Sequence, residues 1–159
     1  MRIGIMSDSH GDQRAIDAAV EAAGKVGLWL HAGDCCPDAA YLGLISSVKV
    51  VNVSGNCDWP DSSNADEVTV EAGGHKIFLT HIYGVRYTLD VLTDAAREAG
   101  ADIAVYGHTH VADEVPGDVY VLNPGSVSRP RDEARPSFMI VDLEAGQKPL
   151  VKLLRLRHR

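Results

Sequence analysis

Short apolar runs alternate with segments of helical periodicity along the first third of the chain. The run Arg2–Met6 is mostly apolar and ends at polar residues, which is typical of a buried strand. Apolar residues recur at helical spacing from Ala15 to Ala23, and Gly24 follows as a common helix stop. This alternation predicts a parallel sheet with right-handed crossovers. The expected elements are strands at 2–6, 26–31 and 48–53 and helices at 12–23 and 38–46.

The rest of the chain changes to strands that are joined by hairpins. Residues 67–71 and 76–80 flank Gly73-Gly74, which predicts a hairpin, and residues 54–65 have the composition of a loop. A helix is expected at 86–99 and strands at 101–106, 118–122, 137–143 and 150–156. Charged residues alternate with leucines in the last of these, which indicates an edge strand. The pattern as a whole predicts an α/β fold with two sheets.

Length and composition narrow the class of protein. The chain has 159 residues, of which 45% are hydrophobic, so one domain over residues 1–159 is expected. Apolar runs stay well short of the roughly 20 residues that a membrane helix needs. The N-terminal residues indicate a first strand rather than a signal peptide, and a cytoplasmic location is the expectation. The net charge of −7 argues against non-specific binding of nucleic acid.

Polar clusters directly follow five of the strand-like runs. They are Asp8-Ser9-His10, Gly33-Asp34, Gly55-Asn56-Cys57-Asp58, Thr80-His81 and Gly107-His108-Thr109-His110. Ligands of open α/β sheets bind at the carboxyl ends of strands, so these clusters are expected to converge. The glycines that precede three of them allow tight turns and close approach of the backbone.

The candidate ligands are two Asp, one Asn and four His side chains, which suit Mn²⁺, iron or Zn²⁺ better than a thiolate site would. Seven candidates exceed the needs of one tetrahedral ion and fit two ions that share a carboxylate. Two divalent ions with two carboxylates leave a net charge of about +2, which suits a phosphate ester and a bridging hydroxide.

These ordered motifs, over residues 3–131, resemble those of the calcineurin-like metallophosphoesterases. The small size and the segment Asn123-Pro124-Gly125-Ser126-Val127-Ser128-x-Pro130-Arg131 resemble the short prokaryotic phosphodiesterase subgroup. Each dipeptide alone is a weak signal, whereas five in order at strand ends are highly specific. The resemblance implies a two-sheet β-sandwich flanked by helices, an α/β/β/α fold.

The resemblance also implies a function and a set of ligands. Asp8, His10 and His110 would hold a first ion; Asn56, His81 and His108 would hold a second; and Asp34 would bridge both. The ions would be Mn²⁺ first, with Zn²⁺, Fe²⁺ or Ni²⁺ as alternatives. The implied enzyme is a phosphodiesterase in which a metal-bridging hydroxide attacks the phosphorus of a small phosphate ester in line. Homodimerisation is compatible with the resemblance.

The chain departs from the family pattern at two positions. Cys57 stands where many members have a His that stabilises the phosphate or protonates the leaving group, and a thiol is the poorer general acid near pH 7. His81 is the one His at a strand end where many relatives have His-Gly-His. Asp34, Asn56, Cys57 and His81 are therefore the candidate catalytic residues, and His81 stays in the ligand set because it directly follows its strand.

Several other residues have a structural and a functional interpretation. His31 is expected to be a buried, hydrogen-bonded residue rather than a ligand, His75 to be solvated in its hairpin turn, and Cys35 and Cys36 to be packing residues. For Asp58 an orienting role and a backbone cap are balanced, and Trp59 and Tyr83 either line the substrate mouth or pack. Arg129 and Arg131 either meet substrate phosphate or form surface ion pairs.

Two other functions compete with a phosphodiesterase. A phosphomonoesterase would use the same site, and Cys57 weighs mildly against it. Some proteins with this fold are non-catalytic interaction scaffolds, usually with eroded ligands, whereas all seven ligand positions here carry suitable residues.

Overall fold

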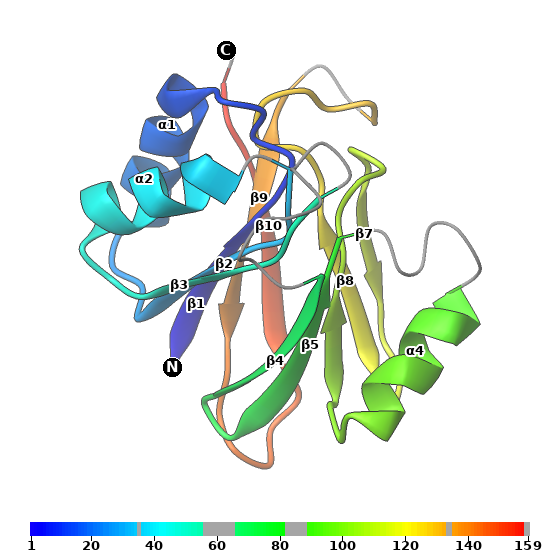
Figure 1. Ribbon diagram of the computed structural model, residues 1–159. Coiled ribbons are helices and arrows are strands. Elements are labelled where there is room, and N and C mark those ends of the chain that lie inside the picture. The colour runs from blue at the N-terminus through cyan, green and yellow to red at the C-terminus, as the bar shows by residue number, and fades with distance from the viewer. Residues whose placement is uncertain (35, 56–65, 82–88, 133–134, 158–159) are drawn as a thin grey trace.

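Two five-stranded sheets pack face to face, with helices on both outer faces (Figure 1). The computed structural model describes residues 1–34, 36–55, 66–81, 89–132 and 135–157. The first sheet has the strand order β10 (Leu150–Arg155), β9 (Ser137–Asp142), β1 (Arg2–Met6), β2 (Leu28–His31) and β3 (Val50–Asn52). The second has the order β4 (Glu67–Ala72), β5 (His75–Thr80), β6 (Ile103–Val105), β8 (Tyr120–Pro124) and β7 (Ala112–Val115). This arrangement confirms the two-sheet sandwich that the sequence predicts.

The helices lie where the alternation of strands and helices places them. Helices α1 (Gln13–Ala23) and α2 (Cys36–Ser46) cover the outer face of the first sheet, and α4 (Leu89–Glu98) covers that of the second (Figure 1). Asp12 caps α1, because its side chain accepts a hydrogen bond from the Ala15 N–H. No helix in the described ranges is long and apolar enough to cross a membrane.

Three apolar layers follow from this arrangement. The central layer is formed by inward-facing side chains of both sheets, with Ile5 and Leu30 from the first and Leu79 and Leu122 from the second, all fully buried. The two outer layers lie between each sheet and its helices. Both faces of each sheet are thus covered, which explains why its central strands are short continuous apolar runs.

Each sheet is mixed rather than parallel throughout. β1, β2 and β3 are parallel, as predicted, but β9 and β10 join the same sheet in antiparallel pairing, with Ile5 opposite Met139. β10 is an edge strand, which confirms the interpretation of the C-terminal pattern. In the second sheet, β5, β6 and β8 are parallel, whereas β4 and β7 pair antiparallel at the edges.

Strand β7 is the element that the sequence analysis missed. Asp113 and Glu114 stand in its middle, and its side chains are exposed or half-buried, so it has no apolar alternation to detect. Backbone pairing with β8 holds it at the edge of the second sheet, with Ala112 opposite Pro124. The other predicted strands and helices are present, with ends that differ by a few residues.

The prediction that His75 is solvated is wrong. The residue is 8% exposed, and its Nδ1 lies 2.5 Å from Asp102 Oδ2 while its Nε2 lies 3.0 Å from the carbonyl oxygen of Glu144. Both partners are acceptors, so the ring donates at both nitrogens only as an imidazolium. His75 begins β5 of the second sheet and Glu144 follows β9 of the first, so the contact links the two sheets at the end of β5 remote from His81.

The pKa of His75 reflects this environment. Burial lowers it, but the hydrogen bond to Asp102 and the carbonyl of Glu144 together raise the pKa above its ordinary value of about 6.5. A group whose pKa is raised by folding stabilises the protein fully below its unfolded pKa, and that contribution is lost as the pH rises through the folded pKa.

We therefore expect His75→Gln to destabilise the protein by about 1 kcal/mol near pH 6, a value reduced for the solvent exposure of Asp102, and by less near pH 9. Urea unfolding in EDTA at the two pH values measures this difference, and Asp102→Asn should show the same pH dependence. Equal losses at pH 6 and pH 9 would contradict the assignment of an imidazolium.

Candidate metal centre

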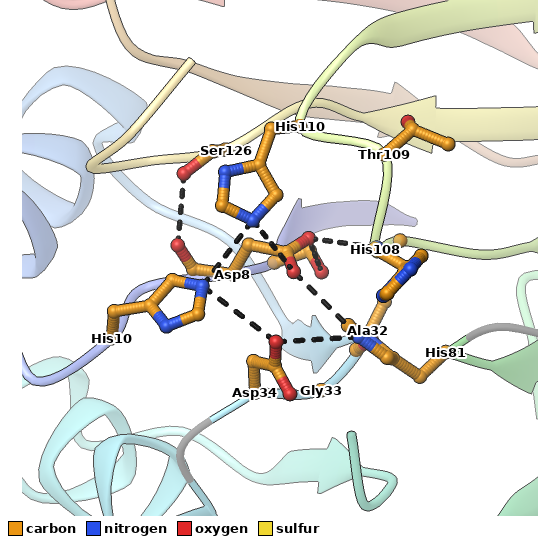
Figure 2. Close-up of polar contacts among 12 residues, drawn as sticks. Asp8, His10, Ala32, Gly33, Asp34, His81, His108, Thr109, His110 and Ser126 are labelled. Carbon is orange, nitrogen blue, oxygen red and sulfur yellow. Dashed lines mark hydrogen bonds and ion pairs between the residues drawn. The ribbon is translucent and has the colours of Figure 1, made fainter. Parts of the chain in front are cut away.

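Strand ends of both sheets bring the predicted ligands to one edge of the sandwich (Figure 2). Asp8 and His10 follow β1, Asp34 follows β2, His81 directly follows β5, and His108 and His110 follow β6. These six side chains lie close together, as the strand-end argument predicts. The other two predicted site residues, Asn56 and Cys57, lie outside the described residues, as do Cys35, Asp58, Trp59 and Tyr83.

Asp8, His10 and His110 form one cluster of candidate ligand atoms. His110 Nε2 lies 3.4 Å from Asp8 Oδ1 and 3.3 Å from His10 Nε2. Two ligands of one ion, each bound at about 2.0–2.2 Å, are about 3.0–3.5 Å apart. The three donor atoms are therefore spaced as ligands of a single ion would be.

A second cluster contains Asp8, Asp34 and His81. His81 Nε2 lies 3.5 Å from Asp34 Oδ2 and 3.7 Å from Asp8 Oδ1. The ring of His108 meets the ring of His81 edge-on, with centroids 5.3 Å apart, so it borders this cluster. Asp34 Oδ2 is also 3.6 Å from His10 Nε2 and thus faces both clusters, as a bridging carboxylate does.

Asp8 provides a test of whether these residues suit a cation. The side chain is fully buried; its Oδ2 accepts hydrogen bonds from Ser7 Oγ at 2.6 Å and from the His108 N–H at 3.0 Å. Its Oδ1 is the buried side-chain oxygen that has no hydrogen-bond partner in the described part of the chain. A buried carboxylate oxygen without a partner is costly, and a cation between Asp8 and the neighbouring imidazoles would satisfy it.

Two histidines are held with Nε2 turned toward the carboxylates. The Nδ1–H of His81 donates to the Ala32 carbonyl at 2.6 Å, and that of His110 donates to the Arg129 carbonyl at 2.6 Å. A hydrogen bond of this kind fixes the tautomer and leaves the Nε2 lone pair available to a metal. Sequence reasoning missed both acceptors, because a backbone carbonyl has no residue signature.

Charges within the cluster tune its protonation. Burial raises the pKa of Asp8, but His110, His81 and Ser7 more than offset this and lower it below its ordinary value. Asp8 raises the pKa of His110, and the two carboxylates raise that of His81 against the effect of burial. Burial lowers the pKa values of His10 and His108. The carboxylate is thus kept ionised, and two imidazoles are kept neutral, which are the forms that bind metals.

The backbone of the site adopts an uncommon conformation. Asp8, His10, Asp34, His108 and His110 all have positive φ, between 48° and 73°, and Ser47 is the one other described residue besides glycine that does. Such conformations cost free energy and persist where the surrounding structure imposes them, often at functional sites. Their concentration here is independent evidence that the strand ends are built around these side chains.

Glycine permits the close approach of the loops, as the sequence analysis predicts. Gly33 has a φ of +98°, and a side chain there would place its Cβ 2.7 Å from His81 Nδ1. A Cβ at Gly107 would overlap Ser7 Oγ and lie 2.9 Å from Asp8 Oδ2. The missing side chains thus leave the space in which the ligand-bearing loops meet.

His31 is confirmed as a buried, hydrogen-bonded residue. It is fully buried, its Nδ1 accepts from the Gly33 N–H at 3.2 Å, and its Nε2 lies 2.9 Å from Ser9 Oγ. Ser9 Oγ in turn donates to Asp38 Oδ2 at 2.5 Å. This network lies behind the two aspartate loops and supports their backbone.

The structure bears on the alternative roles of Cys36, Arg129 and Arg131. Cys36 is half-buried with its Sγ 3.8 Å from the Val53 carbonyl, which fits a packing residue. Arg129 and Arg131 are exposed, and the ion pairs found among the described residues involve neither of them. The surface ion pair that was one interpretation of these arginines is therefore not seen in the described ranges.

We expect Gly107→Ala to destabilise the protein by about 1–3 kcal/mol and to lower Mn²⁺ affinity by at least about tenfold, because the methyl group displaces Asp8. Calorimetric titration with Mn²⁺ and thermal melting measure the two effects. Gly43→Ala is the matched control, since its Cβ would make only an ordinary contact of 3.5 Å with Val50. Unchanged Mn²⁺ affinity in Gly107→Ala would show that close packing at this turn does not shape the site.

Comparisons with known proteins agree with this geometry. The profile of a family described as the calcineurin-like phosphoesterase superfamily domain matches residues 1–146. The chain is 34% identical over 148 residues to the probable metallophosphoesterase YsnB of Bacillus subtilis, covering 91% of this chain and 85% of the relative. The solved structure of an archaeal phosphodiesterase superposes with a TM-score of 0.76 at 28% identity, covering 98% of this chain and all (100%) of the other.

A further solved structure shares the fold at lower identity. Vps29 from Entamoeba histolytica, crystallised with zinc, superposes with a TM-score of 0.75 at 21% identity, over 99% of this chain and 100% of the other. At that identity the likeness concerns the fold alone.

Proposed function

The chain belongs to the calcineurin-like phosphoesterase superfamily, and on that premise we propose that it hydrolyses phosphodiesters with two divalent metal ions. The first metal site consists of Asp8, His10 and His110, and the second of Asn56, His81 and His108. Asp34 bridges the two. The family makes the chain a metal-dependent phosphoesterase; the two-ion site and the preference for diesters are the proposal.

The position of Asp34 carries this proposal. One of its carboxylate oxygens, Oδ2, lies 3.6 Å from His10 Nε2 and 3.5 Å from His81 Nε2, and the residue is 2% exposed. A buried carboxylate placed between imidazoles of two clusters has the arrangement that two ions about 3.5–4 Å apart require. Asp8 Oδ1 likewise lies 3.4 Å from His110 Nε2 and 3.7 Å from His81 Nε2, so both buried carboxylates face imidazoles of both clusters.

The chain's own residues prepare the site for an anionic substrate. When bound, two divalent ions supply positive charge for the phosphate and lower the pKa of water to near neutrality. Asp8 and Asp34 neutralise about half of that charge, and the neutral imidazoles add none, so a field that attracts phosphate remains. Arg129 and Arg131 add exposed positive charge nearby, on the segment that also contacts His110.

The donor atoms of the two clusters limit which metals the site would bind. Both clusters consist of imidazole nitrogens and carboxylate oxygens, and among the described residues no thiolate takes part in either. Such a donor set accommodates Mn²⁺, Zn²⁺, Fe²⁺ or Ni²⁺, and Mn²⁺ is the ion that we propose first. The substrate is a small phosphate ester, and the net charge of −7 argues against non-specific nucleic-acid binding.

The preference for diesters rests on Cys57. A neutral thiol donates a proton to a leaving alkoxide less readily than an imidazolium does, which favours substrates with good leaving groups and little need for a general acid. A phosphomonoesterase is the alternative with the same site. A non-catalytic scaffold is disfavoured, because suitable residues occupy all seven ligand positions.

The proposal also covers the domain organisation, the cellular location and the oligomeric state. A single apolar layer shared by both sheets supports one domain over residues 1–159. A cytoplasmic enzyme is supported by the composition, because three cysteines are too few to suggest a disulfide framework. Homodimerisation stays a prediction of the family resemblance.

We expect Asp34→Asn to lower the rate of hydrolysis of an activated aryl phosphodiester in Mn²⁺ by at least about 10³-fold, because the amide cannot bridge two cations. Steady-state assays measure the rate, and circular dichroism verifies the fold. The matched control is Asp90→Asn, an exposed carboxylate on α4, which should retain full activity. Turnover by a folded Asp34→Asn variant at the wild-type rate would refute the bridging role.

We also expect the enzyme to hydrolyse an aryl diester faster than the matched aryl monoester. Cys57→His should raise the rate on monoesters with poor leaving groups by about tenfold or more, because an imidazolium with a pKa of about 6.5 is the better acid near pH 7. Paired kcat/KM values on the two substrates test both statements. A monoester preference in the wild type would favour the alternative enzyme, and Cys57→Ser controls for loss of the thiol.

A further inference from the structure

We propose that the hydroxyl groups of Ser126 and Ser128 position the Asp8 loop and thereby set the metal affinity of the first site more strongly than that of the second. The inference rests on the proposed two-ion function and concerns residues to which that function assigns no role. Both serines belong to the segment that follows β8, which the sequence analysis singled out only as a subgroup signature. They are positioning residues, because they contact the loop and not the substrate.

The backbone carbonyl of Asp8 is the point of attachment. Ser126 Oγ donates to it at 2.8 Å and Ser128 Oγ at 3.0 Å, and Figure 2 shows the Ser126 contact. A carbonyl oxygen has two lone pairs, so this acceptor is fully used. Both hydroxyls are buried, at 0% and 1% exposure, so water cannot replace them without rearrangement.

These bonds act where the backbone is strained. Asp8 has a φ of 56°, and its Oδ1 and Oδ2 are directed at the clustered imidazoles and at the His108 N–H. A left-handed aspartate relaxes unless its surroundings hold it. Two donors on its carbonyl hold the peptide orientation and, through it, the direction of the side chain.

The same segment also holds His110. Ser126 Oγ accepts from the backbone N–H of Ser128 at 3.1 Å and of Arg129 at 2.7 Å, which closes a tight turn. That turn presents the Arg129 carbonyl to His110 Nδ1 at 2.6 Å, and the Arg131 N–H donates to the His110 carbonyl at 2.9 Å. One segment therefore orients two of the three ligands of the first site.

The second site has a different support. The ring of His81 is held by the carbonyl of Ala32, which directly follows β2, and the hydroxyls of Ser126 and Ser128 donate to Asp8 instead. Asp8 also belongs to the second cluster, so loss of the serine contacts should loosen the first site most and should loosen the second, which keeps the support of His81 by Ala32, less. Ser126 should matter more than Ser128, because it serves both the Asp8 carbonyl and the turn before Arg129.

The test measures Mn²⁺ binding to Ser126→Ala, Ser128→Ala and the double variant by titration calorimetry and electron paramagnetic resonance. The wild type is measured first, and His10→Ala assigns which binding step belongs to the first site. We expect Ser126→Ala to weaken that step by about tenfold and Ser128→Ala by less, with a clearly smaller loss at the second step. The double variant should lose more than the product of the single losses, because it alone leaves the Asp8 carbonyl without a donor.

Ser137→Ala is the matched control. Its hydroxyl is also fully buried and donates to a backbone carbonyl, that of Pro124 at 2.7 Å, and not to the Asp8 loop, while its backbone N–H, which the substitution leaves in place, donates to the Ser126 carbonyl at 2.9 Å. It should lower the melting temperature in EDTA about as much as Ser128→Ala and leave both Mn²⁺ affinities unchanged. Ser128→Ala keeps one bond to Asp8, so it should fold even if the double variant does not.

The outcomes distinguish failure of the positioning role from failure of the two-ion proposal. Fewer than two Mn²⁺ ions on the wild type would refute the two-ion proposal itself. Two ions on the wild type with unchanged first-site affinity in the folded serine variants would overturn the positioning role alone. Equal weakening of both sites, or the same selective loss in Ser137→Ala, would also overturn it, since either result indicates general destabilisation.

Discussion

The structure depends on burying two carboxylates, those of Asp8 and Asp34, beside the imidazoles of the site. Asp8 is fully buried and Asp34 is 2% exposed, and one oxygen of Asp8 has no hydrogen-bond partner among the residues described. Buried charge of this kind is tolerated only where opposite charge or a cation compensates it. The imidazoles around the carboxylates lower the pKa of Asp8, and a divalent ion would serve that purpose better. The remaining features of the site follow from this requirement.

Neighbouring strands, glycines and backbone carbonyls hold the buried carboxylates and imidazoles in place. Parallel strands of both sheets end at one edge, glycines let the ligand-bearing loops approach, and backbone carbonyls direct Nε2 of His81 and His110 inward. Positive φ at five of the polar residues is held by surrounding hydrogen bonds, with Ser126 and Ser128 on the Asp8 carbonyl as the clearest case. The chemistry of the candidate ligands therefore depends on the residues packed behind them.

Much of the fold and of the candidate site could be predicted from the chain. Central strands are continuous apolar runs because both faces are covered, and polar residues directly after them mark the site, as at His81. Prediction failed where a side chain's surroundings come from distant segments. β7 has no apolar pattern and depends on pairing with β8, and His75 is buried by Asp102 and Glu144 rather than by its own hairpin.

The sequence by itself determined the kinds of candidate ligand, their order along the chain and the strands that carry them, because periodicity and strand-end position are local properties. Only the tertiary structure decided which donor atoms face each other, which nitrogen of each imidazole is turned inward and which buried groups hold the loops. Those facts depend on contacts between residues up to 120 positions apart, such as Ser128 with Asp8, and on backbone carbonyls that every residue possesses. A one-dimensional pattern contains neither kind of information.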